Sequence, residues 1–104
     1  MSLATIAGHE VNIDDEGFMT VYGEWSEEIG AALASNIGID LTERHWDVIR
    51  FLRDDFRAEG ETATVRRVSA VGGVGPKELF GLFPKKPAKK MAYVAGLPKP
   101  IGCV

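Results

Sequence analysis

Cysteine is the scarcest chemistry-bearing residue of this chain: its 104 residues contain one, Cys103, beside two histidines. A single cysteine cannot form an internal disulfide, which excludes a secreted scaffold held together by disulfides. His9 and His45 are far apart in sequence, so no set of metal ligands stands at a known spacing. The sequence also lacks the GxGxxG and P-loop patterns of nucleotide sites. We therefore expect no metal and no cofactor.

Long apolar runs and an excess of basic residues are missing as well. No segment approaches the roughly 18 apolar residues of a membrane span, and the N-terminus shows no charged region before an apolar stretch. We therefore expect a soluble cytoplasmic protein without a membrane partner. The formal net charge of -3 argues against direct nucleic-acid binding, which a surface rich in basic charge would favour.

The length and the patterns that are present predict one domain over residues 1–104, mainly α-helical. Near the N-terminus, Val11 and Ile13 alternate with polar residues, and residues 14–17 supply turn chemistry before Phe18 and Met19. This pattern predicts a small β-hairpin whose strands flank residues 14–17.

Helix signals follow from Ser26 onward. A helix is expected over 26–36, and the most regular one over 43–59, where apolar residues recur at spacings of three and four before Gly60. Valines spaced by three predict a third helix near 65–71, although their β-branched side chains leave a strand as the alternative. Prolines open two further helices, which are expected over 76–83 and 87–96. Glycine and proline then prevent a helix over 97–104. The fold class is thus a small orthogonal helical bundle with an N-terminal hairpin and a flexible C-terminal arm over 97–104.

The polar residues that could have a functional role in this bundle each have a simpler structural interpretation. His45 could act as a base or a ligand, but a surface or capping role suits a lone histidine at a helix start better. Asp54 and Asp55 are adjacent, so they are interpreted as a solvated helix face and not as a catalytic pair. The helices around Gly60 have helix-turn-helix spacing, in which Arg66 or Arg67 would contact DNA; the acidic net charge weakens this alternative.

The C-terminal thiol is the feature that the helix and hairpin patterns do not explain. Cys103 follows Pro98, Pro100 and Gly102, so little structure is expected around it, and an exposed thiol without a use is a liability. Lysines precede it, and their positive charge would favour the thiolate form of the cysteine. The same charge could attract an acidic protein surface or the phosphates of an RNA. The simpler interpretation is that these lysines only keep a linker solvated. These lysines are Lys85, Lys86, Lys89, Lys90 and Lys99. We predict a thiol that is presented to another protein, with Lys89, Lys90, Lys99, Arg66 and Arg67 as partner-binding residues.

The run LFPKKPAKKMAYVAGLPKPIGCV resembles the C-terminal signature of the DsrC/TusE family, and DDEGFM and GIDLTERHWDVIRFLRDDF follow the same family order. The resemblance implies a helical bundle with a hairpin, and a sulfur-relay carrier that accepts sulfur as a persulfide on Cys103. It also implies an upstream sulfurtransferase complex as donor. The acceptor would be the tRNA enzyme that makes 2-thiouridine, or dissimilatory sulfite reductase.

One departure from the family bears on function. Members that work with sulfite reductase carry a second cysteine eleven residues before the penultimate one, where this chain has Ala92. This chain therefore cannot carry out chemistry that needs two thiols in one chain, but Cys103 can still carry a persulfide. This favours the single-cysteine relay of tRNA thiolation, although the connector 72–75 looks shorter than in those members. A partner of sulfite reductase or of sulfur oxidation stays the alternative. The protein would act as a cosubstrate more than as an enzyme with a small-molecule site of its own.

Overall fold

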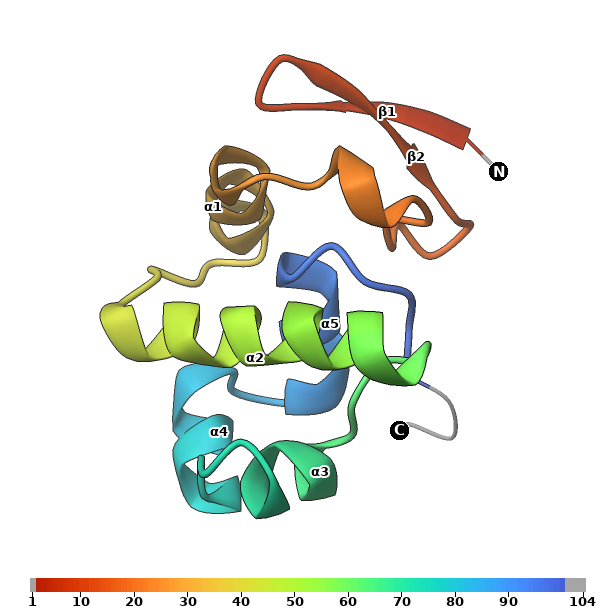
Figure 1. The fold of residues 1–104 in the computed structure, drawn as a ribbon. Helices are drawn as coiled ribbons and strands as arrows, with labels where there is room; N and C mark the ends of the chain where they lie inside the picture. Colours follow the sequence, from red (N-terminus) through yellow and green to blue (C-terminus); the bar gives the residue numbers. More distant parts are fainter. Residues whose placement is uncertain (1, 101–104) are drawn as a thin grey trace.

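An antiparallel hairpin followed by five α-helices and one short 3-10 helix makes up residues 2–100, the part of the chain that the computed structural model describes (Figure 1). This architecture confirms the predicted mainly α-helical fold class with an N-terminal hairpin. The elements are β1 (Ser2–Ile6), β2 (His9–Ile13), η1 (Tyr22–Glu24), α1 (Glu27–Asn36), α2 (Glu43–Glu59), α3 (Val65–Ala70), α4 (Pro76–Leu82) and α5 (Pro87–Val94).

The hairpin forms with a different partner strand from the one predicted. β1 pairs with β2 around the two-residue turn Ala7-Gly8, whose φ angles of 52° and 82° suit a primed hairpin turn. The expected turn at residues 14–17 also forms, closed by backbone N–H groups that donate to the Asp14 carboxylate. Beyond that turn the chain makes only an isolated bridge between Ile13 and Met19. The primed turn fits the strand twist, which explains why β2 takes β1 as its neighbour.

The helices begin and end close to where the sequence places them. Ser26 caps α1 by accepting from the N–H of Ile29, and Gly60 ends α2 in the left-handed conformation at φ 78°. The 65–70 segment is a helix and not a strand, because the Thr64 hydroxyl accepts from the N–H of Arg67 and caps its first turn.

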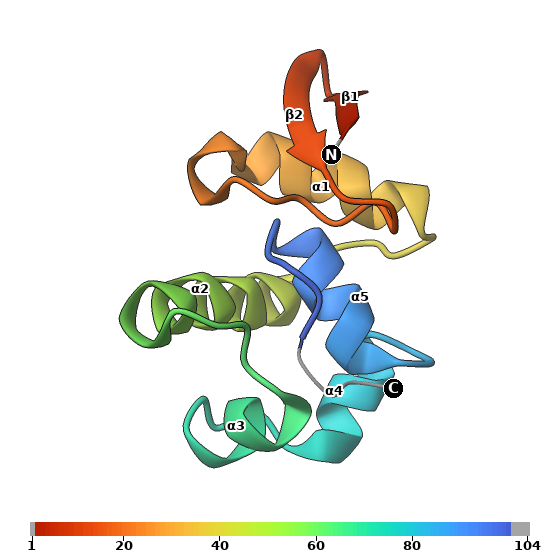
Figure 2. The ribbon, with the colours of Figure 1, turned by 90° about the vertical axis from the view of Figure 1, so that its right-hand side faces the viewer.

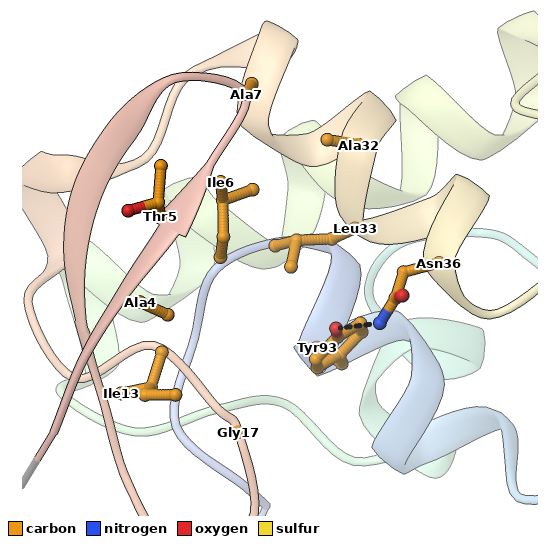
Figure 3. Close-up of a pocket in the computed structure, with 10 residues that line it drawn as sticks. All are labelled: Ala4, Thr5, Ile6, Ala7, Ile13, Gly17, Ala32, Leu33, Asn36 and Tyr93. Atoms are coloured by element: carbon orange, nitrogen blue, oxygen red, sulfur yellow. Dashed lines mark hydrogen bonds between the residues drawn. The ribbon is translucent and has the colours of Figure 1, made fainter.

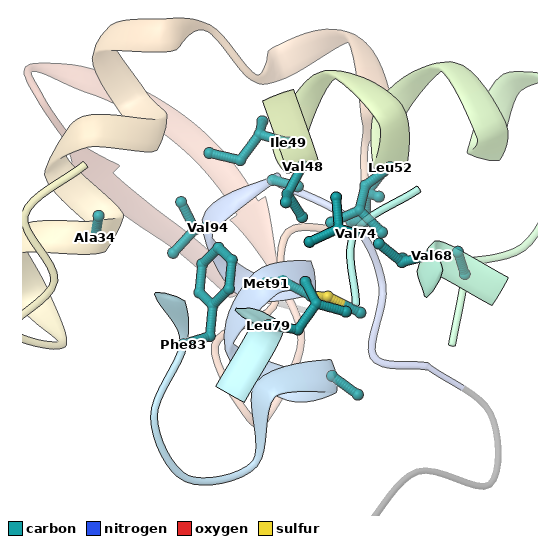
Figure 4. Packing of buried hydrophobic residues seen from close by; sticks show 14 of the residues in the cluster. Ala34, Val48, Ile49, Leu52, Val68, Val74, Leu79, Phe83, Met91 and Val94 are labelled. Atoms are coloured by element: carbon teal, nitrogen blue, oxygen red, sulfur yellow. The ribbon is translucent and has the colours of Figure 1, made fainter. Parts of the chain in front are cut away.

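The elements lie in three tiers, seen most clearly in Figure 2: the hairpin with α1, then α2 with α5, then α3 with α4. The main core extends from Ala34 on α1 through the middle tier to α3 and α4 (Figure 4), and it includes the fully buried Ile49, Leu52, Phe83 and Met91. A second cluster, which is Val11, Met19, Ile29 and Leu33, joins the hairpin to α1. Trp25 and Tyr93 pack against both clusters. These two aromatic residues therefore connect the upper tier to the core.

Candidate functional site: the chain that leads to the C-terminal thiol

The predicted nucleophile, Cys103, lies outside the described residues, and the chain that leads toward it lies against the body. Two parts differ in their contacts: the root segment, residues 94–97, and the linker segment, residues 98–100. All four residues of the root segment are buried, with Val94, Ala95 and Leu97 fully so. Pro100 in the linker segment is also buried. The first part of the arm predicted from residue 97 thus packs on the body, because Leu97 is an apolar side chain that docks in the core.

Trp25 holds the start of the root segment. Its indole N–H donates to the carbonyl of Val94 at 2.9 Å, across 69 residues of sequence. The ring also passes close to two glycines: a Cβ atom at Gly30 would lie 2.7 Å from Cζ2, and one at Gly96 would overlap the indole. Gly96 adopts φ +70°, which favours glycine as well. The root segment can therefore approach Trp25 this closely only because both positions lack a side chain.

Arg53 of α2 holds the next carbonyl. Its guanidinium donates to the carbonyls of Ala95 and Tyr22, each at 2.9 Å. The same group lies 3.9 Å from the ring centroid of Tyr22 and 4.3 Å from that of Trp25, in cation–π geometry. Burial lowers the pKa of Arg53, which nevertheless stays a cation because arginine is not deprotonated in proteins. One half-buried side chain thus fixes α2, η1 and the root segment to one another.

The linker segment is held by one contact from each side. The Thr62 hydroxyl, from the loop between α2 and α3, donates to the carbonyl of Pro98 at 2.8 Å. The ammonium group of Lys99 lies 3.2 Å from the carboxylate of Glu16, in the turn after β2. These two contacts come from elements that are remote in sequence from each other. They give the linker segment a defined path across the body.

The structure brings the three predicted lysines to one face. Lys89 and Lys90 line a shallow groove of about 300 Å³ together with Glu16 and Phe18, and Glu16 is also the partner of Lys99. The ammonium group of Lys90 donates to the carbonyl of Pro84. We call Lys89, Lys90 and Lys99 the lysine face. It presents positive charge beside the linker segment, which suits an acidic partner surface.

Arg66 and Arg67, both on α3, are placed differently from each other. Arg67 meets Asp55 of α2 through hydrogen bonds of 2.6–3.0 Å, and both residues line a pocket of about 180 Å³ with Thr62. Hydrogen bonds from Arg67, aided by its charge, hold the pKa of Asp55 below its ordinary value. Asp55 is buried at 8% exposure, so the prediction that it belongs to a solvated face is wrong. Arg66 is exposed.

A surface or a capping role was predicted for His45. The structure shows that it caps a helix and that it is not on the surface. Its Nδ1 accepts from the backbone N–H of Thr42, and its Nε2 lies 2.8 Å from the carbonyl of Leu82. Both ring nitrogens are therefore engaged in structure. Within residues 2–100, no group of three or more His, Cys, Asp or Glu side chains is arranged to hold a metal ion. The described part of the chain also contains no helix long and apolar enough to cross a membrane.

Ala92 is fully buried on α5, and its carbonyl accepts from the N–H of Leu97 at 3.0 Å. This position, where some relatives would carry a second cysteine, therefore lies directly beneath the root segment. A methyl group there supplies packing and no sulfur chemistry.

A pocket of about 360 Å³ lies between the hairpin and α1, with Tyr93 at one end (Figure 3). Its lining is small, apolar or uncharged, and the Asn36 amide donates to the Tyr93 hydroxyl at 3.0 Å. No charged side chain lines the pocket, and its hydroxyl groups are those of Thr5 and the bonded Tyr93. No general base stands beside either hydroxyl in this lining, so we do not include the pocket in the site.

Three residues that hold the site were not predicted from sequence: Trp25, Arg53 and Thr62. Arg53 had a usable signal, because it follows Ile49 by four residues and so shares the side of α2 that packs inward. Thr62 and Trp25 act through partners 36 and 69 residues away, which local pattern does not reveal.

The fold and the site together define a class of protein. It is a small helical domain with a short hairpin, and the domain holds in place the segment that leads to one penultimate cysteine. The family model described as "DsrC like protein" matches residues 5–104. The chain belongs to this DsrC-like family, which confirms the resemblance predicted from its C-terminal signature.

Relatives and solved structures agree with this assignment. The Escherichia coli (strain K12) protein named "Sulfurtransferase TusE" is 38% identical over 104 residues, which covers 93% of this chain and 95% of that protein. The NMR structure of Allochromatium vinosum DsrC matches with a TM-score of 0.83 and 35% identity, covering 98% of this chain and 97% of that one. The oxidized gamma-subunit of the dissimilatory sulfite reductase (DsrC) from Archaeoglobus fulgidus matches with a TM-score of 0.78 and 37% identity, covering 99% and 100%.

Proposed function

We propose that this chain is a cytoplasmic sulfur-relay carrier: Cys103 accepts a sulfur atom as a persulfide and passes it to a partner enzyme. The observation that carries the proposal is the path of residues 94–100, which are held to the body by side chains from four separate elements and lead to a lone thiol. The name of the Escherichia coli relative, a sulfurtransferase, supports the same conclusion.

The relay needs two exchange steps that balance without an oxidant. In the first, the Cys103 thiolate attacks the outer sulfur of a donor persulfide; the sulfur–sulfur bond of the donor breaks, the donor leaves as a thiolate, and Cys103 carries the persulfide. In the second, a thiolate of the acceptor attacks the outer sulfur on Cys103, and the Cys103 thiolate leaves. A single cysteine is sufficient for both steps.

The partners we propose are an upstream sulfurtransferase complex as donor and a tRNA-thiolating enzyme as acceptor. The lysine face would meet acidic groups on such a partner beside the linker segment, with Arg66 and Arg67 as further contacts. Ala92 supports the single-thiol relay, because a pair of thiols cannot form within this chain.

Dissimilatory sulfite reductase is the second candidate acceptor. The similarity to the gamma-subunit of that enzyme from Archaeoglobus fulgidus favours it. The two candidates differ in a measurable product: loss of this protein would lower 2-thiouridine in tRNA in the first case and leave it unchanged in the second.

Intact-mass spectrometry tests the carrier role directly. Incubation of the reduced protein with inorganic polysulfide should add the mass of one sulfur atom, and the addition should vanish after treatment with a thiol reductant. The variant Cys103→Ser should show no addition. A protein that gains no sulfur, or that gains it equally in Cys103→Ser, would contradict the proposed function.

A further inference from the structure

We propose that Thr62 is a positioning residue for the relay: its hydroxyl fixes the Pro98 carbonyl and thereby sets the direction in which the segment carrying Cys103 leaves the body. The use of this contact in a relay rests on the proposed function, whereas the contact itself is part of the fold. Thr62 is buried at 8% exposure, and its donor bond to Pro98 measures 2.8 Å.

The hydroxyl acts at the point where other anchoring is weakest. The ring of Pro98 is exposed, so side-chain packing does not fix this residue, whereas Leu97 before it is fully buried. Proline has no N–H to donate. The carbonyl of Pro98 is therefore the backbone group through which the body can orient the start of the linker segment, and Thr62 is the side chain that engages it.

The loop that carries Thr62 is itself fixed at both ends. Asp55, before the loop, and Arg67, after it, are joined by hydrogen bonds as short as 2.6 Å. Ala63, beside Thr62, is buried at 3% exposure, and the Thr64 hydroxyl caps α3. The Thr62 hydroxyl is therefore presented from a rigid support and not from a freely moving loop.

The chain after Pro98 is suited to transmit this direction. The rings of Pro98 and Pro100 each fix φ near −65°, which removes two of the rotations through which the linker segment could turn. Cys103 follows Pro100 by three residues, and three residues span at most about 11 Å. The placement of Pro98 thus limits the region around the body in which the thiol can be presented to a partner.

A spin label on Cys103, the only thiol in the chain, reads out this placement without any further engineering. Paramagnetic relaxation of backbone amides in the full-length protein would be compared among Thr62→Val, which keeps the side-chain shape, Thr62→Ser, which keeps the hydroxyl, and the parent chain. We expect Thr62→Val to change the relaxation rates of amides within residues 14–18 and 60–64 by about threefold, because one hydrogen bond shifts a local equilibrium by roughly 2- to 10-fold. Thr62→Ser should retain the parent rates.

Ser69→Ala is the control, since it removes a nearby hydroxyl, on α3, that has no hydrogen-bond partner among the described residues. It should leave the relaxation pattern unchanged. If Thr62→Val proves unfolded by circular dichroism, Thr62→Ala serves the same comparison. Parent-like relaxation in the folded Thr62→Val or Thr62→Ala variant would overturn the proposal, as would an equal change in Ser69→Ala.

The polysulfide mass assay on the same unlabelled samples separates this inference from the proposed function. We expect equal sulfur addition in the parent, Thr62→Val and Thr62→Ser, because a small donor needs no directed approach. Sulfur addition that is absent in all three would contradict the carrier role while leaving the relaxation result, and hence the positioning of the segment by Thr62, intact. A loss of addition confined to Thr62→Val would contradict a purely positioning role.

Discussion

The root segment and the linker segment are adjacent in sequence, yet the body holds them by different means. In the root segment, buried side chains combine with hydrogen bonds from Trp25 and Arg53 to two successive carbonyls. In the linker segment, one hydroxyl and one ion pair make the polar contacts, and the Glu16 side chain of that pair is 53% exposed. Stability is thus concentrated before Pro98. After Leu97, the Thr62 hydroxyl and Pro100 are buried, so the exposed ion pair is the contact that opens at the smallest cost.

The largest expected effect is on the root segment. Gly96→Ala places a methyl group against the indole of Trp25 at a φ of +70°, so it should lower the free energy of unfolding by about 3 kcal/mol, from overpacking and backbone strain together. Urea denaturation measures this loss. Gly38→Ala is the matched control, because Gly38 has φ +76° with no atom within 4 Å of the added methyl. That variant should lose only about 1 kcal/mol. Equal losses would show that the close approach to Trp25 does not matter.

An intermediate effect is expected in the support of the linker segment. Asp55→Asn should lower the free energy of unfolding by about 2 kcal/mol at neutral pH, because it removes the charge that Arg67 binds. The neighbouring Asp54→Asn, at an exposed position, is the control and should change it by less than about 0.5 kcal/mol. Chemical denaturation at pH 7 gives both values, and a similar loss in the two variants would contradict the distinction.

The same substitution has a pH signature. Hydrogen bonds from Arg67 lower the pKa of Asp55 in the folded protein, so this contribution is fully present above the ordinary pKa near 4 and disappears as the pH falls through the folded value. The destabilisation by Asp55→Asn should therefore shrink below about pH 4. Urea curves at pH 7 and in the acid range check the sign, and a difference that grows on acidification would contradict it.

The smallest effect is expected in the linker segment. Lys99→Gln and Glu16→Gln should each change the free energy of unfolding by less than about 0.5 kcal/mol, because the pair is exposed and screened. A double-mutant cycle at low and high salt measures their coupling. A coupling above about 1 kcal/mol that persists in high salt would mean that the linker segment is as firmly held as the root segment.

Local sequence signals predicted the helices well because caps and apolar spacing act within a few residues. Ser26 and Gly60 are examples, and α2 spans the predicted 43–59. Asp55 was misjudged, although its spacing of three from Leu52 already places it on the buried stripe of that helix. The hairpin partner was missed because the turn at 14–17 is the more polar of two possible turns, while Ala7-Gly8 sets the pairing.

The candidate site was predicted only in part. The lysine face could be anticipated from composition, and the structure places its members around Glu16. The residues that hold the root segment could not, because each contact joins positions tens of residues apart, and a hydrogen bond of that range has no local signature. Long-range contacts of this kind are decided by the whole fold.

The distances in sequence that these contacts span have a consequence for synthesis of the protein on the ribosome. Trp25 and Arg53 are made early, but their acceptors on Val94 and Ala95 follow 69 and 42 residues later. A nascent chain that has not yet released residue 94 therefore leaves the indole N–H and the guanidinium without these partners. The docking of the root segment is therefore a late step of folding, which can occur only after residues 94 and 95 have emerged.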